Sequence, residues 1–582
     1  MSRARTALFA SFVVVAACTS DPPVAVERSD SSSGELAPDI DRLPPDVGAN
    51  APGDDAVGDE TGDDVDTGPA PPTTLTWSSC ESYGIPSADI LGTRGWECAT
   101  LDAAMDPFDA EADAGEVELA ITRHPATGER RGTILLNPGG PGGAGLPLAW
   151  GLRDELSPTL LRGFDVVSWD PRGVGRSTPR IDCDDDVPPG DVDFIERCVE
   201  LTGTLSGFLA APYSAADMES IRIALGEEQL DYLGYSYGAL LGSTYASAHP
   251  DRVGAFVLDG ATDPLVGTER GPFDDGFPSL ADDGFEAAER RFTEICDATD
   301  ACLFSLDAAT VLADLAEQVP VLPTPDFDGP PERLDVRDYD DVIDGALIFA
   351  GEWELTATGL SDADLGDASA LAAITARSSG SGEGDPAIGE SDFSEANYMI
   401  YCADFGRQLS GQSFCDEMPV AGETLGPVSP VELDRNMLVI GTEFDPLTPG
   451  YHAAEFAEAL GDATHIIWEG VGHTAYPGWT TCIDDAVDAQ FLRRPVPDDG
   501  TRCAFLLGVD DDEALGDELF GHGDVESDSL LRDRLEEDLD DRTAECQAES
   551  LNQESDRVIS HVILDVTSQV ALDALEVAAA AC

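Results

Sequence analysis

The chain contains no lysine and few basic residues of any kind. Its 582 residues carry 31 Lys+Arg, all of them arginine, against 115 Asp+Glu, which gives a formal net charge of -84. Nucleic acids and anionic membrane surfaces are bound through basic patches that release counterions. The charge balance therefore argues against nucleic acid as a partner. We interpret the acidic excess as a solvated surface suited to salty surroundings.

The N-terminal apolar stretch is too short to span a membrane. Residues 7–17 follow Arg3 and Arg5 and have the form of a secretion signal. They lead into "VAAC", which resembles a bacterial lipobox, so we predict that residues 1–18 are a lipoprotein signal peptide and that Cys18 carries lipid. An ordinary signal peptide that happens to contain a cysteine is the alternative. Either way, we expect the protein outside the cytoplasm, anchored to the cell membrane or secreted.

Aromatic residues are absent from residues 19–76, which are rich in Asp, Pro, Gly and Ser. A segment of this composition cannot bury enough apolar surface to offset the entropy of ordering. We predict that it is a disordered acidic tether, which would hold the folded part away from a membrane surface.

Cysteine, by contrast, is frequent. Of the 13 cysteines, those other than Cys18 form an even set, as expected for disulfide pairing after export. Proximity along the chain suggests the pairs Cys80–Cys98, Cys183–Cys198, Cys296–Cys302, Cys402–Cys415, Cys482–Cys503 and Cys546–Cys582. No pair has the two-residue spacing of a zinc knuckle, and no histidine lies beside them, so we expect no metal.

Five segments share one form, a short apolar run rich in β-branched residues that ends in a glycine- or aspartate-rich loop. They are residues 132–145, 164–177, 230–238, 253–264 and 436–446. Helix-like segments lie between several of them, as at residues 215–226. This alternation favours an α/β fold with a mostly parallel, doubly wound sheet, whose functional loops gather at the carboxyl ends of the strands.

Ser236 stands between two glycines in "GYSYG", after an apolar run and before a helix-like one. The glycines relieve crowding around a strained serine, and the helix N-terminus adds backbone N–H groups, as a nucleophile elbow requires. The Gly-x-Ser-x-Gly pattern also occurs by chance, so a structural serine in a strand-to-helix turn is the alternative.

A nucleophilic serine needs a base, and the base needs an orienting acid. Asp445 in "GTEFDPLTP" and His473 in "EGVGHTAY" follow Ser236 in that order, each after an apolar run. His473 lies in a glycine-flanked loop, whereas four other histidines lie in or beside regular elements: His124, His249, His452 and His465. For Asp445, the alternative is a turn residue before Pro446.

The loop "NPGGPGG", residues 137–143, carries few side chains, so its N–H groups can point at a substrate oxyanion. The N–H of Tyr237, directly after the serine, would be a second donor. A phosphate cradle is the competing interpretation, but the loop lacks both the Lys-Ser/Thr ending of a P-loop and the Gly-x-Gly-x-x-Gly spacing.

Together with "DVVSWDPRGVGRS", these loops follow one another in an order that is typical of a known family. The chain resembles the α/β-hydrolase serine peptidases of the tripeptidyl aminopeptidase and prolyl aminopeptidase type. The resemblance covers roughly residues 77–503. It implies that Ser236 is the nucleophile, Asp445 the acid and His473 the base, with the N–H groups of Gly140 and Tyr237 as the oxyanion hole. One departure is the start of the glycine loop, where prolyl aminopeptidases usually have a histidine.

Position and resemblance together imply a hydrolase core in two parts, residues 77–264 and 431–503, with a cap at 265–430 and no cofactor. Residues 504–582 extend beyond the family pattern and hold two helix-like stretches amid many acids. We predict an acidic helical C-terminal extension there.

The triad chemistry serves esters and amides alike, so specificity should come from the cap. An aminopeptidase must recognise a free α-ammonium group, for which a buried carboxylate is the natural partner. We therefore expect a serine exopeptidase that acts through an acyl-enzyme on peptides with a free N-terminus, with Glu352, Glu354 and Asp404 as candidates for the amine site. An esterase or lipase is one alternative, and an inactive binding lipoprotein is the other.

Overall fold

A computed structural model describes residues 75–504 with gaps at 81–94, 110–113, 154, 184–186, 188–193, 265–281, 299–301, 326–332, 379–389, 406–414, 416 and 420–421. The predicted signal peptide, Cys18, nearly all of the predicted tether and nearly all of the predicted C-terminal extension lie outside the described residues. None of the helices in the described part combines the length and apolar content that a membrane span requires.

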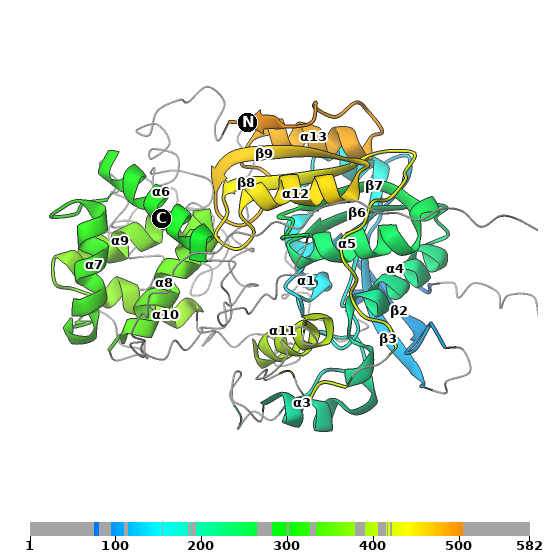
Figure 1. Cartoon of the computed structure of the whole chain (residues 1–582), viewed down its shortest axis with the longest axis horizontal. Coiled ribbons are helices and arrows are strands. Elements are labelled where there is room, and N and C mark those ends of the chain that lie inside the picture. The colour runs from blue at the N-terminus through cyan, green and yellow to red at the C-terminus, as the bar shows by residue number, and fades with distance from the viewer. Residues whose placement is uncertain are drawn as a thin grey trace, which may run out of the picture. The chain divides into compact units, whose positions relative to one another are not determined.

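A ten-stranded sheet forms the centre of the fold, in the order β1-β2-β3-β5-β4-β6-β7-β8-β9-β10 (Figure 1). Its strands are β1 (Ser78–Ser79), β2 (Glu97–Ala104), β3 (Glu116–His124), β4 (Gly132–Asn137), β5 (Phe164–Trp169), β6 (Leu230–Tyr235), β7 (Val253–Asp259), β8 (Met437–Phe444), β9 (Ala463–Val471) and β10 (Thr501–Cys503). The first three strands pair antiparallel, and β3 meets β5 antiparallel. From β5 to β10 every pairing is parallel.

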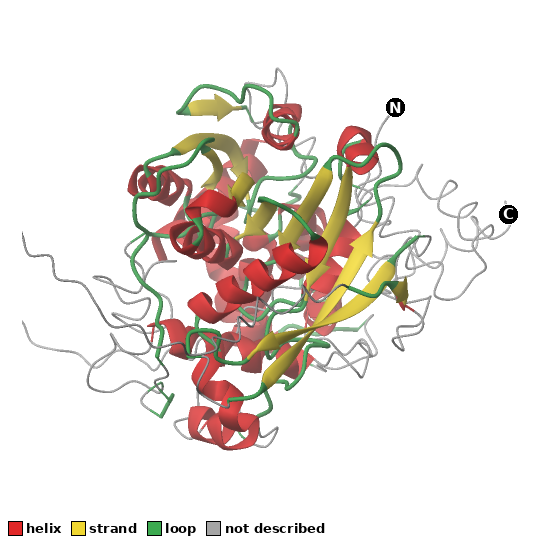
Figure 2. Ribbon diagram, turned by 90° about the vertical axis from the view of Figure 1, so that its right-hand side faces the viewer, coloured by secondary structure: helices red, strands yellow, loops and turns green. Residues whose placement is uncertain are grey.

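The central strands β4 to β7 are buried along their whole length, which explains why they read as continuous apolar runs. Successive side chains of a strand point to opposite faces. Accordingly, Ile134 and Leu136 of β4 belong to one apolar core, and Leu135 belongs to the other. Figure 2 shows the twisted sheet with helices on both sides, which cover these two cores.

Seven helices belong to the hydrolase core. They are α1 (Gly145–Leu152), α2 (Pro158–Gly163), α3 (Phe194–Thr202), α4 (Ala211–Leu225), α5 (Tyr237–Ala248), α12 (Gly450–Leu460) and α13 (Thr481–Phe491). Trp150 of α1 and Phe491 of α13 pack into the first core, while Met218 of α4 and Leu240 of α5 pack into the second. The observed architecture is the α/β-hydrolase arrangement predicted from the sequence.

Between β7 and β8 the described residues form six α-helices, and we call these the helical insertion. They are α6 (Asp282–Ala298), α7 (Ala308–Gln318), α8 (Val336–Ile348), α9 (Trp353–Asp364), α10 (Ser369–Ser378) and α11 (Glu390–Phe405). Helices α6 to α10 pack against one another, whereas α11 packs against α3 (Figure 1). The insertion occupies the part of the chain where the sequence predicts a cap.

Five disulfide bonds are present, and they join the predicted neighbours: Cys80–Cys98, Cys183–Cys198, Cys296–Cys302, Cys402–Cys415 and Cys482–Cys503. The sixth predicted pair, Cys546 with Cys582, lies outside the described residues. Disulfides of this number are typical of proteins that fold in an oxidising compartment.

A buried ion pair fixes the loop after β5. The guanidinium of Arg172 donates to both carboxylate oxygens of Asp217 on α4, at 2.7 and 2.8 Å, and both side chains are only 1% exposed. Arg172 also donates to the carbonyls of Ala104, Met105 and Phe208. The "RGVGRS" loop is thus a structural turn that joins the sheet to α4.

Candidate active site

Ser236 sits in a sharp turn between β6 and α5. Its backbone has φ 54° and ψ -123°, a strained conformation for a residue with a side chain. The serine occupies the N-cap position of α5, yet its side chain makes no capping hydrogen bond. The hydroxyl therefore does not cap the helix, and the residue is partly exposed to solvent.

The two glycines of "GYSYG" are required by close backbone approach. A Cβ atom on Gly234 would lie 2.5 Å from the carbonyl oxygen of Gly238, and a Cβ atom on Gly238 would lie 2.8 Å from Oδ1 of Asn137. Neither gap admits a methyl group. The turn has the local geometry that the sequence predicted for a nucleophile elbow.

Asp445 and His473 follow β8 and β9, and the structure brings them into direct contact. Nδ1 of His473 lies 2.9 Å from Oδ2 and 3.0 Å from Oδ1 of Asp445. Both side chains are almost fully buried. Because β6, β8 and β9 run parallel, Ser236, Asp445 and His473 all follow the carboxyl ends of strands at one edge of the sheet.

The electrostatics of this pair favour an ionised acid beside a basic imidazole. Burial raises the pKa of Asp445, but the charge and hydrogen bond of His473 and two hydrogen bonds from Thr448 outweigh it, so that the pKa is lowered. Burial lowers the pKa of His473, but the attraction and hydrogen bond of Asp445 raise it above 6.5. Each group therefore stabilises the charged form of the other.

The glycine loop after β4 lies directly against the serine turn. A Cβ atom on Gly139 would lie 3.1 Å from Cβ of Ser236, 3.0 Å from the backbone nitrogen of Tyr237 and 2.2 Å from the carbonyl oxygen of Tyr235. Only glycine permits this approach. Among the hydrogen bonds of the described residues, none uses the N–H of Gly140 or that of Tyr237.

Position in the sheet also marks this loop. Strand β4 pairs with β5 on one side and with β6 on the other, so the order of the parallel strands reverses there. Ligands of open α/β sheets bind at such a reversal, outside the carboxyl ends of the strands. Helix α11 covers the loop, because Nδ2 of Asn397 donates to the carbonyl of Pro141 at 2.9 Å.

The loop that carries His473 is anchored through its backbone. The N–H of His473 donates to the carbonyl of Ile348 at 2.7 Å, which is the last residue of α8 in the helical insertion. Thr474 has φ 69°, which is strained for a β-branched residue, and its N–H donates to Oδ2 of Asp445 at 3.3 Å. Gly260 lies beside this loop, where a side chain would be crowded. A Cβ atom on Gly260 would lie only 3.3 Å from Cε1 of His473.

The three candidates for the amine site fall in two places in the helical insertion, with Glu352 and Glu354 at the start of α9 and Asp404 on α11. Asp404 of α11 is buried, and its oxygens accept hydrogen bonds from the Tyr237 hydroxyl at 2.6 Å and from the Ala211 N–H at 2.7 Å. Burial raises the pKa of Asp404 to about 7, against the effect of these bonds. Glu352 precedes α9 and is partly exposed, and Glu354 belongs to α9.

Sequence reasoning did not identify Thr448 as part of the site. Its hydroxyl donates to Oδ2 of Asp445 at 2.8 Å and lies 3.3 Å from Nδ1 of His473. Its N–H donates to Oδ1 of the same carboxylate at 2.8 Å. The position three residues after the acid, in a turn begun by Pro446, is the signal that could have indicated this contact.

Two further acids in the helical insertion, one partly buried and one exposed, were not singled out from the sequence. Asp344 lies one turn before Ile348 on α8, and Glu289 lies on α6. Burial, together with the charges of Asp340, Asp341 and Glu289, raises the pKa of Asp344 to about 7. Burial and Glu286 raise the pKa of Glu289. In a chain this rich in acids, no sequence pattern distinguishes these two.

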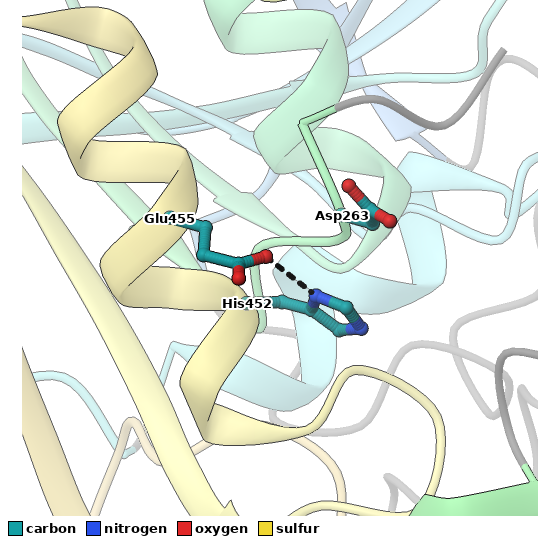
Figure 3. A group of neighbouring side chains, drawn as sticks. All are labelled: Asp263, His452 and Glu455. Carbon is teal, nitrogen blue, oxygen red and sulfur yellow. Dashed lines mark ion pairs between the residues drawn. The ribbon is translucent and has the colours of Figure 1, made fainter. Parts of the chain in front are cut away.

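A cluster of possible metal ligands lies near the acid loop (Figure 3). Asp263 follows β7, while His452 and Glu455 lie one turn apart on α12, and their ligand atoms are within 4.8 Å of one another. Nδ1 of His452 lies 3.5 Å from a carboxylate oxygen of Glu455, which is half exposed. With His452 protonated, its contact with Glu455 is an ion pair between residues one turn apart on α12.

Comparison with known families agrees with this geometry. Residues 132–310 match the family described as the alpha/beta hydrolase fold, and residues 401–503 match the family described as TAP-like protein. The two matches contain the serine turn and the Asp445–His473 pair, respectively.

Curated relatives carry both peptidase and esterase names. The chain is 30% identical over 486 residues to serine protease Hip1 of Mycobacterium tuberculosis, covering 74% of this chain and 91% of the relative. It is 29% identical over 491 residues to carboxylesterase B of the same species, covering 74% and 90%. It is 33% identical over 216 residues to tripeptidyl aminopeptidase of Streptomyces lividans, covering 33% and 38%.

Proposed function

Because the chain belongs to the α/β-hydrolase family of serine peptidases, we propose that Ser236, Asp445 and His473 are its catalytic triad and that it cleaves peptides near a free N-terminus. The observation that supports this triad is the buried hydrogen bond between Asp445 and His473. It lies at the carboxyl ends of the strands, where the strained turn of Ser236 also lies. An acid, an imidazole and a serine hydroxyl in this arrangement perform acyl transfer.

In the first half of the reaction, Nε2 of His473 takes the proton of the Ser236 hydroxyl as its oxygen attacks the scissile carbonyl. The tetrahedral oxyanion would be held by the N–H groups of Gly140 and Tyr237. When the C–N bond breaks, the imidazolium gives its proton to the leaving amine, and an acyl-enzyme remains.

In the second half, His473 takes a proton from water, which attacks the acyl carbonyl, and then returns that proton to the Ser236 oxygen. Asp445 holds the imidazole by Nδ1 throughout, so that Nε2 remains the nitrogen that exchanges the proton. The cycle releases an amine and a carboxylic acid and regenerates the serine.

Recognition of a free N-terminus would use a carboxylate in the helical insertion, which we assign as the cap over the site. The sequence candidates Glu352, Glu354 and Asp404 remain predictions, and Asp404 already accepts two internal hydrogen bonds. Asp344 joins them because it precedes Ile348, the residue bonded to His473, by one turn. Its partly buried carboxylate lies near the acids Asp340, Asp341 and Glu289 in the described part of the chain, so an incoming ammonium group would be favoured there.

An ester hydrolase is the second candidate function, favoured by the similarity to carboxylesterase B. The deciding experiment compares unblocked peptide amides with their N-acetylated copies and with acyl esters of graded length. We expect acetylation to abolish peptide cleavage. Turnover of esters alone would establish the second function instead, and protein that neither hydrolyses an activated ester nor reacts with a fluorophosphonate would be an inactive binding lipoprotein.

Two variants sharpen this test. Ser236→Ala should lose fluorophosphonate labelling, and labelling that persists would remove Ser236 from the triad. Asp344→Asn should raise KM for unblocked peptides but leave ester turnover unchanged. The control is Asp314→Asn, on the neighbouring helix α7 and exposed to solvent.

We also propose that the enzyme works outside the cytoplasm on a lipid anchor at Cys18. The five disulfides support export. Mass spectrometry of the mature N-terminus tests the anchor, and an unmodified start elsewhere would mean simple secretion.

A further inference from the structure

Asp259, the last residue of β7, is fully buried beside the candidate site, and the catalytic scheme above does not use it. Its carboxylate accepts two backbone N–H groups of the loop that carries His473. Ala475 donates to Oδ1 at 3.1 Å and to Oδ2 at 3.0 Å, and Tyr476 donates to Oδ2 at 2.8 Å. The described residues show no arginine paired with this carboxylate.

The same residue also holds the nucleophile turn. The backbone N–H of Ser236 donates to the carbonyl of Asp259 at 2.8 Å, and the parallel register places Asp259 opposite Tyr235. Asp259 therefore contacts the segment that presents the serine with its main chain and the segment that presents the base with its side chain.

The base loop needs such an anchor because it is strained. Thr474, between His473 and the residues bonded to Asp259, has φ 69°, and a conformation of this kind persists only where the surroundings determine it. Asp445 accepts the N–H of Thr474, and Asp259 accepts those of Ala475 and Tyr476. Three successive backbone N–H groups of this loop thus donate hydrogen bonds to two buried carboxylates, those of Asp445 and Asp259.

We propose that Asp259 is a positioning residue, whose ionised carboxylate fixes the 473–476 loop so that His473 faces Ser236. The inference rests on the proposed triad but is independent of which substrate the enzyme prefers. Carboxylates accept more strongly than neutral groups, so a protonated or amide side chain at this position would hold the loop less firmly. A misplacement of about 1 Å in such a site can cost on the order of 10²-fold in rate.

The charges around Asp259 give the proposal a signature in pH. Burial raises its pKa to about 7, while the two backbone donors and the charge of His473 lower it and that of Asp445 raises it. Tyr235, Tyr476 and Asp484 are the other titratable groups of this region. On the acid side, Asp259 would therefore take up a proton near pH 7, and His473, whose pKa is raised by Asp445, would take up another; each uptake would lower activity.

Wild-type enzyme allows a first test that needs no variant. With a neutral activated ester such as p-nitrophenyl butyrate, log(kcat/KM) should fall below about pH 6 with a slope near 2, because two protonations inactivate the free enzyme. A slope of 1 would mean that only His473 matters, and it would overturn the proposal.

The second test uses Asp259→Asn. We expect kcat for the ester to fall by about 10²-fold with KM unchanged, and the acid slope to drop to 1. The control is Asp231→Asn, because Asp231 is another buried acid that accepts a backbone N–H, from Ala255 at 2.8 Å, although it also pairs with Arg493 and lies toward the amino end of β6. The control should keep both kcat and the slope of 2.

Ser236→Ala separates failure of this inference from failure of the triad. If Ser236→Ala is inactive while folded Asp259→Asn keeps full kcat and a slope of 2, the triad stands and the proposal fails. If Ser236→Ala retains activity, the triad itself is wrong. Should Asp259→Asn not fold, the wild-type slope decides.

Discussion

Asp445 faces His473 with both carboxylate oxygens, at 2.9 and 3.0 Å from Nδ1. The same carboxylate accepts the N–H groups of Leu447 and Thr448 and the hydroxyl of Thr448. It is therefore fixed by the turn that follows β8 before it contacts the imidazole. The orientation of the base thus follows from local turn geometry as well as from the histidine itself.

Replacing Asp445 by Asn should leave the fold intact but remove the acceptor that selects the Nδ1–H tautomer. In serine proteases the corresponding change lowers kcat by about 10⁴-fold, and we expect a loss of that order here. Steady-state kinetics with an activated ester would measure it. A loss of less than about 10-fold would show that another group orients His473.

One part of the pH dependence of activity follows from the raised pKa of His473, in addition to the protonation of Asp259 proposed above. The base works only when neutral, so activity should fall as the pH decreases through a value above 6.5. The contribution of His473 to folding stability changes with pH in the opposite direction. Because the folded-state pKa is raised, the stability contributed by protonated His473 is complete below 6.5 and is lost as the pH rises through the folded pKa. Midpoints of kcat/KM against pH for the wild type and for Asp445→Asn, which should shift downward, would check the assignment.

The buried Arg172–Asp217 pair should show strongly non-additive energetics. Burial raises the pKa of Asp217 in spite of its attraction to Arg172, so desolvation largely offsets the pairing. Removing one partner leaves an uncompensated buried charge, and either Arg172→Met or Asp217→Leu should cost about 3–5 kcal/mol. The double variant should lose clearly less than the sum, as measured by urea unfolding. Additive losses would show that the two side chains act independently.

Salt should stabilise the protein. The net charge is -84, and α8 alone carries Asp341 and Asp344, whose pKa values are raised to about 6 and about 7 by burial and by neighbouring acids. Raising the ionic strength to 1 M shortens the Debye length to about 3 Å and screens this repulsion. The melting temperature should therefore rise between low salt and 1 M NaCl. A flat or falling curve would mean that the acids are already well dispersed.

The sequence predicts the parts of the site that depend on local pattern. Apolar runs ending in glycine-rich loops identified the parallel strands, and the flanking glycines marked Ser236 and His473. Close backbone approach explains this success, because Gly234 and Gly139 have no room for a Cβ atom. Such constraints require one particular residue type at a given position, so they can be recognised from the sequence alone.

What the sequence could not predict depends on strand pairing. Asp259 ends an apolar run before a glycine, as many turn residues do, and its role follows only from the register that puts it beside Tyr235. The Asp344 and Glu289 carboxylates are likewise ordinary in sequence, since only the folded structure brings them near other acids that raise their pKa values. The parallel pairing of β6 with β7, and of β7 with β8, is non-local and leaves no short motif in the sequence.

The bond between the His473 N–H and the Ile348 carbonyl links the catalytic base to the end of α8. A Cβ atom on the preceding Gly472 would lie 3.0 Å from the same carbonyl, so the two segments touch along the main chain. Because the catalytic base and the end of α8 share this main-chain contact, a substitution that shifts the end of α8 should also displace His473. The helical insertion thus contributes to the placement of the proposed base, although it lies outside the sheet.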